Sequence, residues 1–131
     1  MANPNVLAAT TGYAITASYL PTGTSSVVLV PNAAASGKVL RFQFITVANI
    51  DGTNFVNATV ALYSNGAVAQ GSAPSGGTAH AIGSTIAVPA NASIIMSDRT
   101  TPIELNEGWS IIVTSGTASK MEFSYSYVEV A

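Results

Sequence analysis

The chain of 131 residues contains no cysteine and a single histidine. Without cysteine it cannot form a disulfide, a thiolate zinc site or a thiol nucleophile. Charged residues make up 8% of the chain, four Lys or Arg and six Asp or Glu, whereas soluble domains contain about 25%. So few basic residues argue against a nucleic-acid partner, because such proteins neutralise phosphates with dense Lys and Arg. We expect no enzymatic activity, no cofactor and no metal.

Long apolar runs are also missing. No stretch approaches the roughly 18 apolar residues of a membrane-spanning helix, and Met1–Gly12 lacks the basic and apolar regions of a signal peptide. We therefore expect no membrane partner and assembly in the cytoplasm. What the chain does have is small residues: almost half are Ala, Gly, Ser or Thr, and the net charge is only −2. Such a surface suits a chain covered in part by partners, or a free β-rich monomer with a Ser/Thr surface.

The apolar residues recur with period two, which is typical of strands. The alternation is clearest in Met121–Val130, where we predict a buried face of Met121, Phe123, Tyr125 and Tyr127. In Val39–Ile50 the same alternation predicts a face made of Leu40, Phe42, Phe44, Ala48 and Ile50. Between this run and Phe55–Tyr63 lies Asp51-Gly52-Thr53-Asn54. Asp-Gly between two alternating runs indicates a hairpin.

Five shorter runs complete a set of about eight predicted strands: Tyr13–Leu20, Ser25–Val30, Thr85–Val88, Ser93–Met96 and Trp109–Thr114. No window supports a substantial helix. Short strands separated by turns predict an all-β fold, an antiparallel β-sandwich of the jelly-roll type. We predict one sandwich domain over residues 13–131, preceded by an N-terminal arm over residues 1–12. The glycine-, alanine- and serine-rich segment 64–83 is expected to be one long loop.

Few residues are candidates for chemistry. His80 has no evident acid and nucleophile beside it, so we interpret it as a surface histidine. Glu104 and Glu107, with Asp98 nearby in sequence, form a set that could bind calcium or act as acid and base. A polar turn before Trp109 is the simpler interpretation. Alternating tyrosines, at 13 and 19 and at 125 and 127, suit either sugar stacking or core packing.

Several segments together form a recognisable sequence pattern: an apolar strand, a Val-Pro-Ala turn, a second apolar strand, Pro-Ile-x-Leu and Glu-Gly-x-x-Ile. They are Ser84–Ala92, Ile94–Met96, Pro102–Leu105 and Glu107–Ile111, together with Met1–Leu7 and the stretch from Gly37 to Gly52. In these segments the chain resembles small β-sandwich structural proteins of tailed bacteriophages, especially those that infect marine cyanobacteria. The resemblance covers most of the chain outside residues 64–83.

The resemblance implies a virion component and brings no active-site residue with it. The expected role is that of a head decoration, or cement, protein on the capsid surface. Its expected partner is the major capsid protein, and its expected oligomeric state is a homotrimer. A tail, baseplate or fibre component is the alternative, and a carbohydrate-binding adhesion module is a third. We expect partner contacts at Val6 and Leu7 in the arm and at Val68 and Ile82 in the loop.

Overall fold

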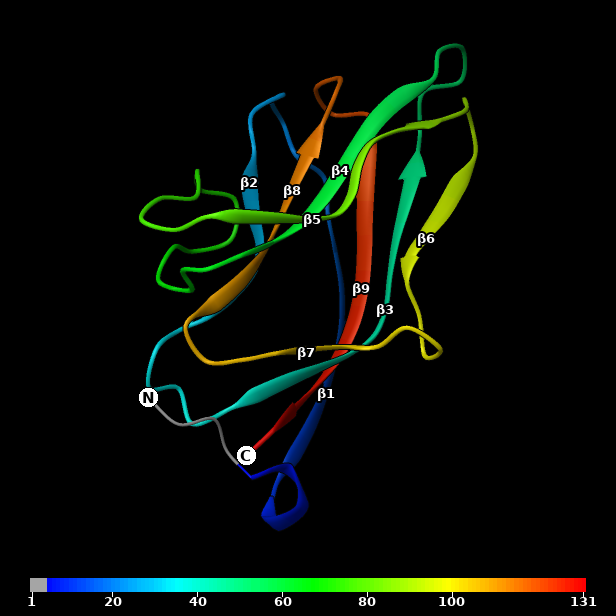
Figure 1. The fold of residues 1–131 in the computed structure, drawn as a ribbon. Coiled ribbons are helices and arrows are strands. Elements are labelled where there is room, and N and C mark those ends of the chain that lie inside the picture. The colour runs from blue at the N-terminus through cyan, green and yellow to red at the C-terminus, as the bar shows by residue number, and fades with distance from the viewer. Residues whose placement is uncertain (1–4) are drawn as a thin grey trace.

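The computed structural model describes residues 5–131 and is an all-β sandwich (Figure 1). Its one helical element among these residues is the 3₁₀ turn η1 (Val6–Ala8). The strands are β1 (Gly12–Tyr19), β2 (Val27–Asn32), β3 (Val39–Asn49), β4 (Val56–Tyr63), β5 (Ala79–Val88), β6 (Ser93–Ser97), β7 (Ile103–Leu105), β8 (Trp109–Ser115) and β9 (Met121–Val130). The eight predicted strands are all present, and the short β7 is an addition.

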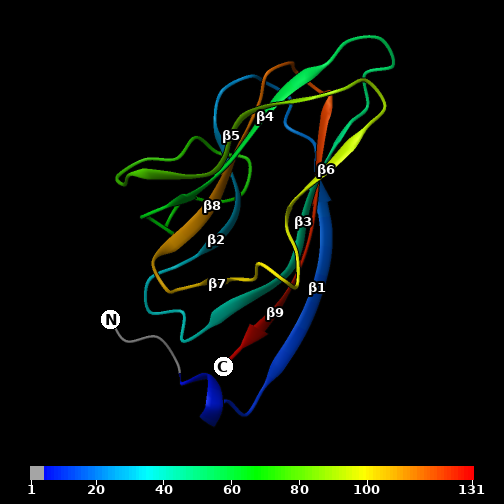
Figure 2. The ribbon, with the colours of Figure 1, turned by 45° about the vertical axis from the view of Figure 1, so that its right-hand side comes forward.

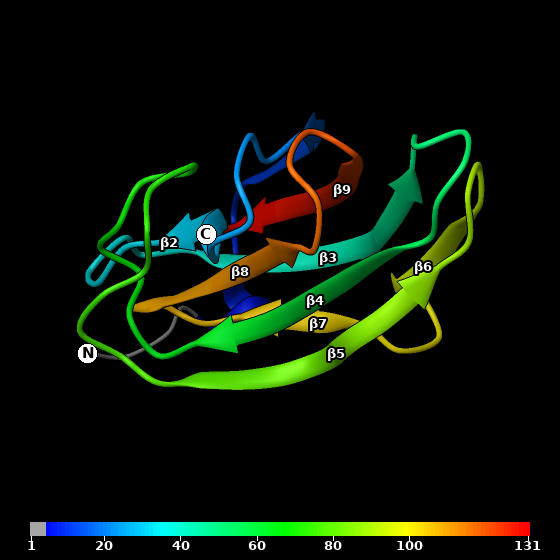
Figure 3. The ribbon, with the colours of Figure 1, turned by 90° about the horizontal axis from the view of Figure 1, so that it is seen from above.

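The strands form two antiparallel sheets that face each other (Figure 2). One sheet has the order β1-β9-β3-β6, with β7 also paired to β3, and the other has the order β2-β8-β4-β5. The first and last strands pair, and the chain passes from one sheet to the other at most connections. This is the arrangement of a jelly roll, with β7 inserted. Seen from above, the edge strands β5 and β6 lie next to each other (Figure 3).

The core lies between the sheets, and β9 supplies its centre. Met121, Phe123 and Tyr125 are buried, as the alternation predicts. Tyr127 is half-buried on the same face, with its ring centroid 5.2 Å from that of Phe42. Strand β9 takes this position because it pairs with β1 on one side and β3 on the other.

The predicted buried face of β3 is correct only in its first half. Leu40 and Phe42 are buried, but farther along the strand Ile45 and Val47 point into the core. The pairing with β9 shifts between Phe42 and Phe44, which is a β-bulge. One extra residue moves every later side chain to the opposite face. Phe44 and Ala48 are therefore half-buried and Ile50 is exposed, against the prediction.

The hairpin predicted at Asp51–Asn54 does not form, because β3 and β4 belong to different sheets. The turn crosses the end of the sandwich instead. Asp51 Oδ1 accepts hydrogen bonds from the amides of Thr53 and Asn54, at 2.8 and 3.1 Å. These hydrogen bonds close the turn without a partner strand. The same residues can therefore form a turn between two sheets or a hairpin within one sheet.

A buried asparagine fastens the connections at each end of the sandwich. At one end, Asn32 Nδ2 donates to the carbonyls of Lys38 and Leu105. At the other, Asn49 Nδ2 donates to the carbonyls of Asn54 and Val88, at 3.0 and 2.9 Å. Each side chain therefore joins two crossing segments. Buried amides are stable when their hydrogen bonds are made in this way.

The predicted loop over residues 64–83 is too long, because β5 begins at Ala79. The segment before β5 lies along the outer edge of β2. The amide of Gly71 donates to the Val28 carbonyl at 2.8 Å, and the amide of Val28 donates to the Ser72 carbonyl at 2.9 Å. A Cβ at Gly66 would lie 2.1 Å from the Asn32 carbonyl oxygen. Glycine is therefore required where this loop meets β2.

Candidate partner-binding surface

The described part of the arm, residues 5–12, contains a short turn that presents Leu7 to solvent. Asn5 begins it: its Oδ1 accepts from the amide of Leu7 at 3.0 Å, and its carbonyl accepts from the amide of Ala8 at 3.0 Å. This is the usual role of asparagine before a helical turn. Val6 is half-buried, whereas Leu7 is 98% exposed. Residues 1–4 of the predicted arm lie outside the described part of the chain.

The arm is fixed to the sandwich just after this turn. The amides of Thr10 and Thr11 both donate to the Ala131 carbonyl, at 2.9 and 3.1 Å, and the Ala131 amide donates back to Thr11. The next large side chain, Tyr13 on β1, is 65% exposed and lies opposite Glu129 of β9. Leu7 thus projects from a base held by paired backbone, so a partner that bound it would need to order little further backbone.

The two loop residues expected to contact partners pack within the chain. Val68 is half-buried on the outer side of the β2-β8-β4-β5 sheet, against a small cluster of Val28, Ala61, Tyr63 and Ile112. Ile82 is half-buried against the main core and belongs to β5. Both therefore have intramolecular roles. The alternation of β4 did not predict this second cluster, because Ala61 and Tyr63 lie on the face opposite the core-facing residues of the strand.

An apolar pocket opens beside the chain's only tryptophan. It has a volume of about 140 Å³ and is lined by Leu62, Ile103, Glu104, Leu105, Asn106 and Trp109. Trp109 is half-buried, and the ring of His80 lies 6.0 Å from its ring. The carboxylate of Glu104 at the rim is paired with Arg41 at 2.8 Å. In the sequence, Trp109 was interpreted only as the start of a strand. The signal available there was the chain's one tryptophan directly after the polar turn 104–108.

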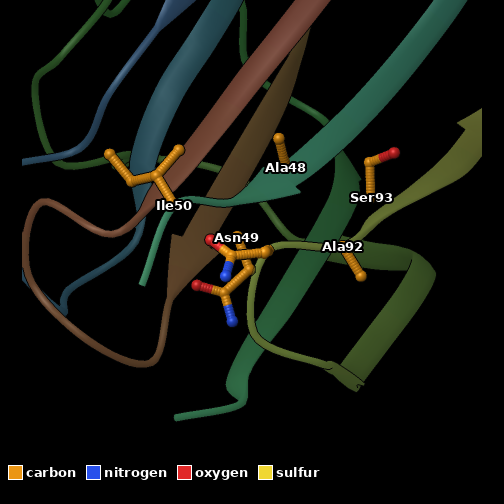
Figure 4. Close-up of a pocket in the computed structure, with 6 residues that line it drawn as sticks. Ala48, Asn49, Ile50, Ala92 and Ser93 are labelled. Carbon is orange, nitrogen blue, oxygen red and sulfur yellow. The ribbon is translucent and has the colours of Figure 1, made fainter. Parts of the chain in front are cut away.

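A second, shallower hollow lies where β3 ends and β6 begins. Its lining is Ala48, Asn49, Ile50, Asn91, Ala92 and Ser93, and its volume is about 380 Å³ (Figure 4). None of these residues is charged, and the Asn49 amide is already bonded to the surrounding turns. The hollow therefore offers a shape but no reactive group.

The carboxylates of the candidate calcium set are used separately. Asp98 Oδ1 accepts from the hydroxyl and the amide of Thr100, at 2.6 and 2.9 Å, and these bonds hold the pKa of Asp98 below its ordinary value. Glu104 pairs with Arg41. No group of three or more His, Asp or Glu that could hold a metal ion occurs among residues 5–131.

The tyrosines of β9 belong to the core more than to the surface. Tyr125 is 5% exposed and stacks on Tyr127 with ring centroids 6.0 Å apart. Its hydroxyl accepts from Gln70 Nε2 at 2.9 Å, which fastens the 64–78 loop to the first sheet. Burial raises the pKa of Tyr127, and the charge of Glu129 adds to this shift. Sugar stacking on Tyr125 is therefore excluded by its burial.

Comparisons of the chain with protein-family models, with curated proteins and with solved structures find no match. In the described residues there is no helix with the length and apolar character needed to cross a membrane. The surface features open to a partner are therefore the exposed Leu7, the hollow between the ends of β3 and β6, and the pocket beside Trp109. This pocket, lined by Leu62, Ile103, Glu104, Leu105, Asn106 and Trp109, is called the tryptophan pocket.

Proposed function

We propose that the protein is a non-enzymatic virion structural protein, a capsid decoration protein that binds the major capsid protein on the outer surface of a phage head. The jelly-roll fold supports this proposal, because viral capsid proteins are one of the groups that use it. The resemblance of the sequence to small phage virion proteins supports it independently. In this proposal the chain assembles in the host cytoplasm and functions on the capsid surface.

The observation that carries the proposal is Leu7, which is almost fully exposed on an arm fixed to the sandwich at Thr10 and Thr11. An apolar side chain held away from its own core gains free energy when another protein buries it, because its apolar surface leaves water. Residues 5–12 contain no charge, so attachment through them depends on apolar and backbone contacts. Such binding is only weakly sensitive to salt, since there is little charge to screen.

The test uses phage heads that lack the protein, mixed with the purified full chain and sedimented. A variant without residues 1–9 keeps the pairing of Thr10 and Thr11 with Ala131 and should stay folded by circular dichroism. We expect wild type to sediment with the heads at low and high salt, and the deletion variant and Leu7→Asp to remain in the supernatant. Binding of both variants at the wild-type level would contradict the role of the arm.

The position of the protein in the particle separates a decoration protein from a tail, baseplate or fibre component. A reconstruction of the virion should show densities spread over the head, each built from chains of 13.3 kDa. Density confined to the tail would overturn the decoration role and support the alternative.

A carbohydrate-binding module is favoured by one observation, the pocket that places Trp109 beside Glu104 and Asn106. Aromatic rings and polar side chains together are the usual elements of a small-molecule site. A glycan array tests it: specific binding that is lost in Trp109→Ala and kept in Tyr13→Ala would support this second function. An array without signal would remove it.

A further inference from the structure

Strand β1 is a long edge strand whose outer side has no partner strand among residues 5–131. It is the first strand in the order β1-β9-β3-β6 and pairs with β9 alone (Figure 2). Its eight residues contain no charge and no proline, and its pairing with β9 runs without a register shift. An edge of this kind offers a row of backbone donors and acceptors to another extended chain.

The other sheet edges are protected in ways that β1 is not. The outer side of β2 exchanges hydrogen bonds with the loop at Gly71 and Ser72. Strand β6 has only five residues and lies beside β5, whose pairing with β4 shifts register twice. Short strands, bulges and covering loops are the means by which proteins prevent pairing at an edge. In the described chain β1 has none of these, so its outer side is open to a partner strand.

The hydrogen bonds at the base of the arm fix which backbone groups of β1 point outward. Thr11 and Ala131 exchange both of their amide–carbonyl bonds, at 3.1 Å each, and so form a hydrogen-bonded pair. Along an antiparallel ladder such pairs alternate with pairs that are not hydrogen-bonded. The register of β1 with β9 continues from Thr11 without interruption. The residues whose amides and carbonyls face away from β9 are therefore Gly12, Ala14, Thr16 and Ser18, and all four are exposed.

The hydrogen-bonding pattern of this edge matches β1 of a second copy that runs antiparallel to it. Residues opposite each other in a sheet share a face, so each outward-bonding residue must lie opposite another of the same set. A two-fold axis at Ile15 meets this condition, because it places Gly12 opposite Ser18 of the second copy and Ala14 opposite Thr16. Every outward amide and carbonyl of both strands then has a partner. An axis at Thr16 also matches the faces, but it leaves Gly12 opposite a residue beyond the strand.

The side chains of this pairing are compatible as well. On the face toward the core, Tyr13 of each copy lies beside Ala17 of the other, and the two Ile15 side chains meet at the axis. Tyr13 is 65% exposed in the single chain, and a large ring beside a small alanine gains contact without a clash. Strand β1 is thus complementary to itself in face, hydrogen bonding, size and charge. These four properties together point to a second copy as the occupant of the edge.

We propose that two copies of the chain pair through β1 about a two-fold axis at Ile15, which joins their first sheets into one continuous sheet. The contact is isologous, since each copy uses the same surface. It produces a dimer, in place of the homotrimer that the resemblance implies. It uses neither Leu7 nor the tryptophan pocket, so failure of this proposal and failure of the capsid contact are separate results.

The first experiment uses the absence of cysteine from the chain. In the proposed register the two Ile15 residues form a non-hydrogen-bonded pair with Cα atoms about 4.5 Å apart, which is within the span of a disulfide. Mild oxidation should therefore convert Ile15→Cys rapidly into a covalent dimer. Thr16→Cys, one residue along the strand, is the matched control and should cross-link at least about tenfold more slowly. Equal rates for the two variants, or faster cross-linking of Thr16→Cys, would overturn the proposal.

The second experiment measures amide hydrogen exchange of the unmodified chain by NMR, together with its solution mass, over a range of concentrations. The amides of Ala14, Thr16 and Ser18 should become protected as the mass rises from one chain to two. The odd-numbered residues of β1 donate to β9 and should be protected at every concentration, so they serve as an internal control. A mass of one chain throughout, or a dimer in which the three outward amides stay unprotected, would contradict pairing through β1.

A variant at one outward position tests the contact directly. Ala14→Pro removes an outward donor, and proline is accepted on the free side of an edge strand. The variant should stay folded by circular dichroism and dimerise at least about tenfold more weakly than wild type, whereas Ala14→Val keeps the donor and should dimerise normally. A folded Ala14→Pro dimer as stable as that of wild type would refute the proposal. If Ala14→Pro does not fold, the exchange pattern of the unmodified chain decides the question.

Discussion

Replacement of Asn49 by alanine tests the view that buried asparagines hold the crossing turns together. Asn49 is 2% exposed. Its Nδ2 donates to the carbonyls of Val88 and Asn54, at 2.9 and 3.0 Å, and its Oδ1 accepts from the amide of Asp51 at 2.9 Å. It therefore connects the end of β3 to both the β3–β4 and the β5–β6 turns.

The expected loss follows from these three bonds. A neutral hydrogen bond contributes about 0.5–1.5 kcal/mol net, and a buried group left unpaired costs more. The Val88 carbonyl would lose its donor inside the sandwich, so we place the destabilisation by Asn49→Ala at roughly 2–4 kcal/mol. In a domain of this size that lowers the melting temperature on the order of 10 °C.

The assay is equilibrium denaturation in urea, with circular dichroism as the signal. Asn106→Ala is the matched control, because this asparagine is exposed and its loss should change stability by less than about 0.5 kcal/mol. Asn49→Asp keeps the shape but replaces the donor with a second acceptor facing carbonyl oxygens, and should destabilise at least as much as alanine. Equal stability of Asn49→Ala and Asn106→Ala would refute the argument.

Three further predictions concern the core, the loop and the stability of the fold at alkaline pH. Phe123→Ala should cost about 3–5 kcal/mol in urea denaturation, because the ring is fully buried between the sheets; a loss below 1.5 kcal/mol, on the order of a volume-conserving swap, would contradict this packing. Gly66→Ala should destabilise by about 1–3 kcal/mol, since its Cβ would meet backbone atoms, whereas Gly23→Ala, with open space around it, should be tolerated. The raised pKa of Tyr127 stabilises the fold below the ordinary tyrosine pKa of 10.0, and this contribution is lost as pH rises toward the folded-state pKa. Thermal melts of Tyr127→Phe should therefore decline less at alkaline pH than those of wild type, and identical declines would count against the assignment.

The candidate site was partly visible in the sequence. Leu7 was a predicted contact residue, and the structure places it in solvent. Val68 and Ile82 looked equally available but pack within the chain. Whether such a side chain is exposed is not decided by its neighbours in the sequence, because it depends on which face of the second sheet the loop covers. The tryptophan pocket also requires β4, β7 and β8 to be adjacent, and strand order is not encoded in the spacing of apolar residues.

The class of fold follows from the apolar pattern of the sequence alone. Alternation with period two specifies strands wherever one face is buried, so β1, β4 and β9 begin and end close to where the pattern predicts. The tertiary structure decided the bulge after Phe42, the sheet to which each strand belongs and the course of the loop over residues 64–78. A bulge and a crossing turn use the same residue types as a regular strand and a hairpin. Only the pairing between distant segments distinguishes them, because the hydrogen bonds and buried contacts that stabilise each arrangement form between strands far apart in the chain.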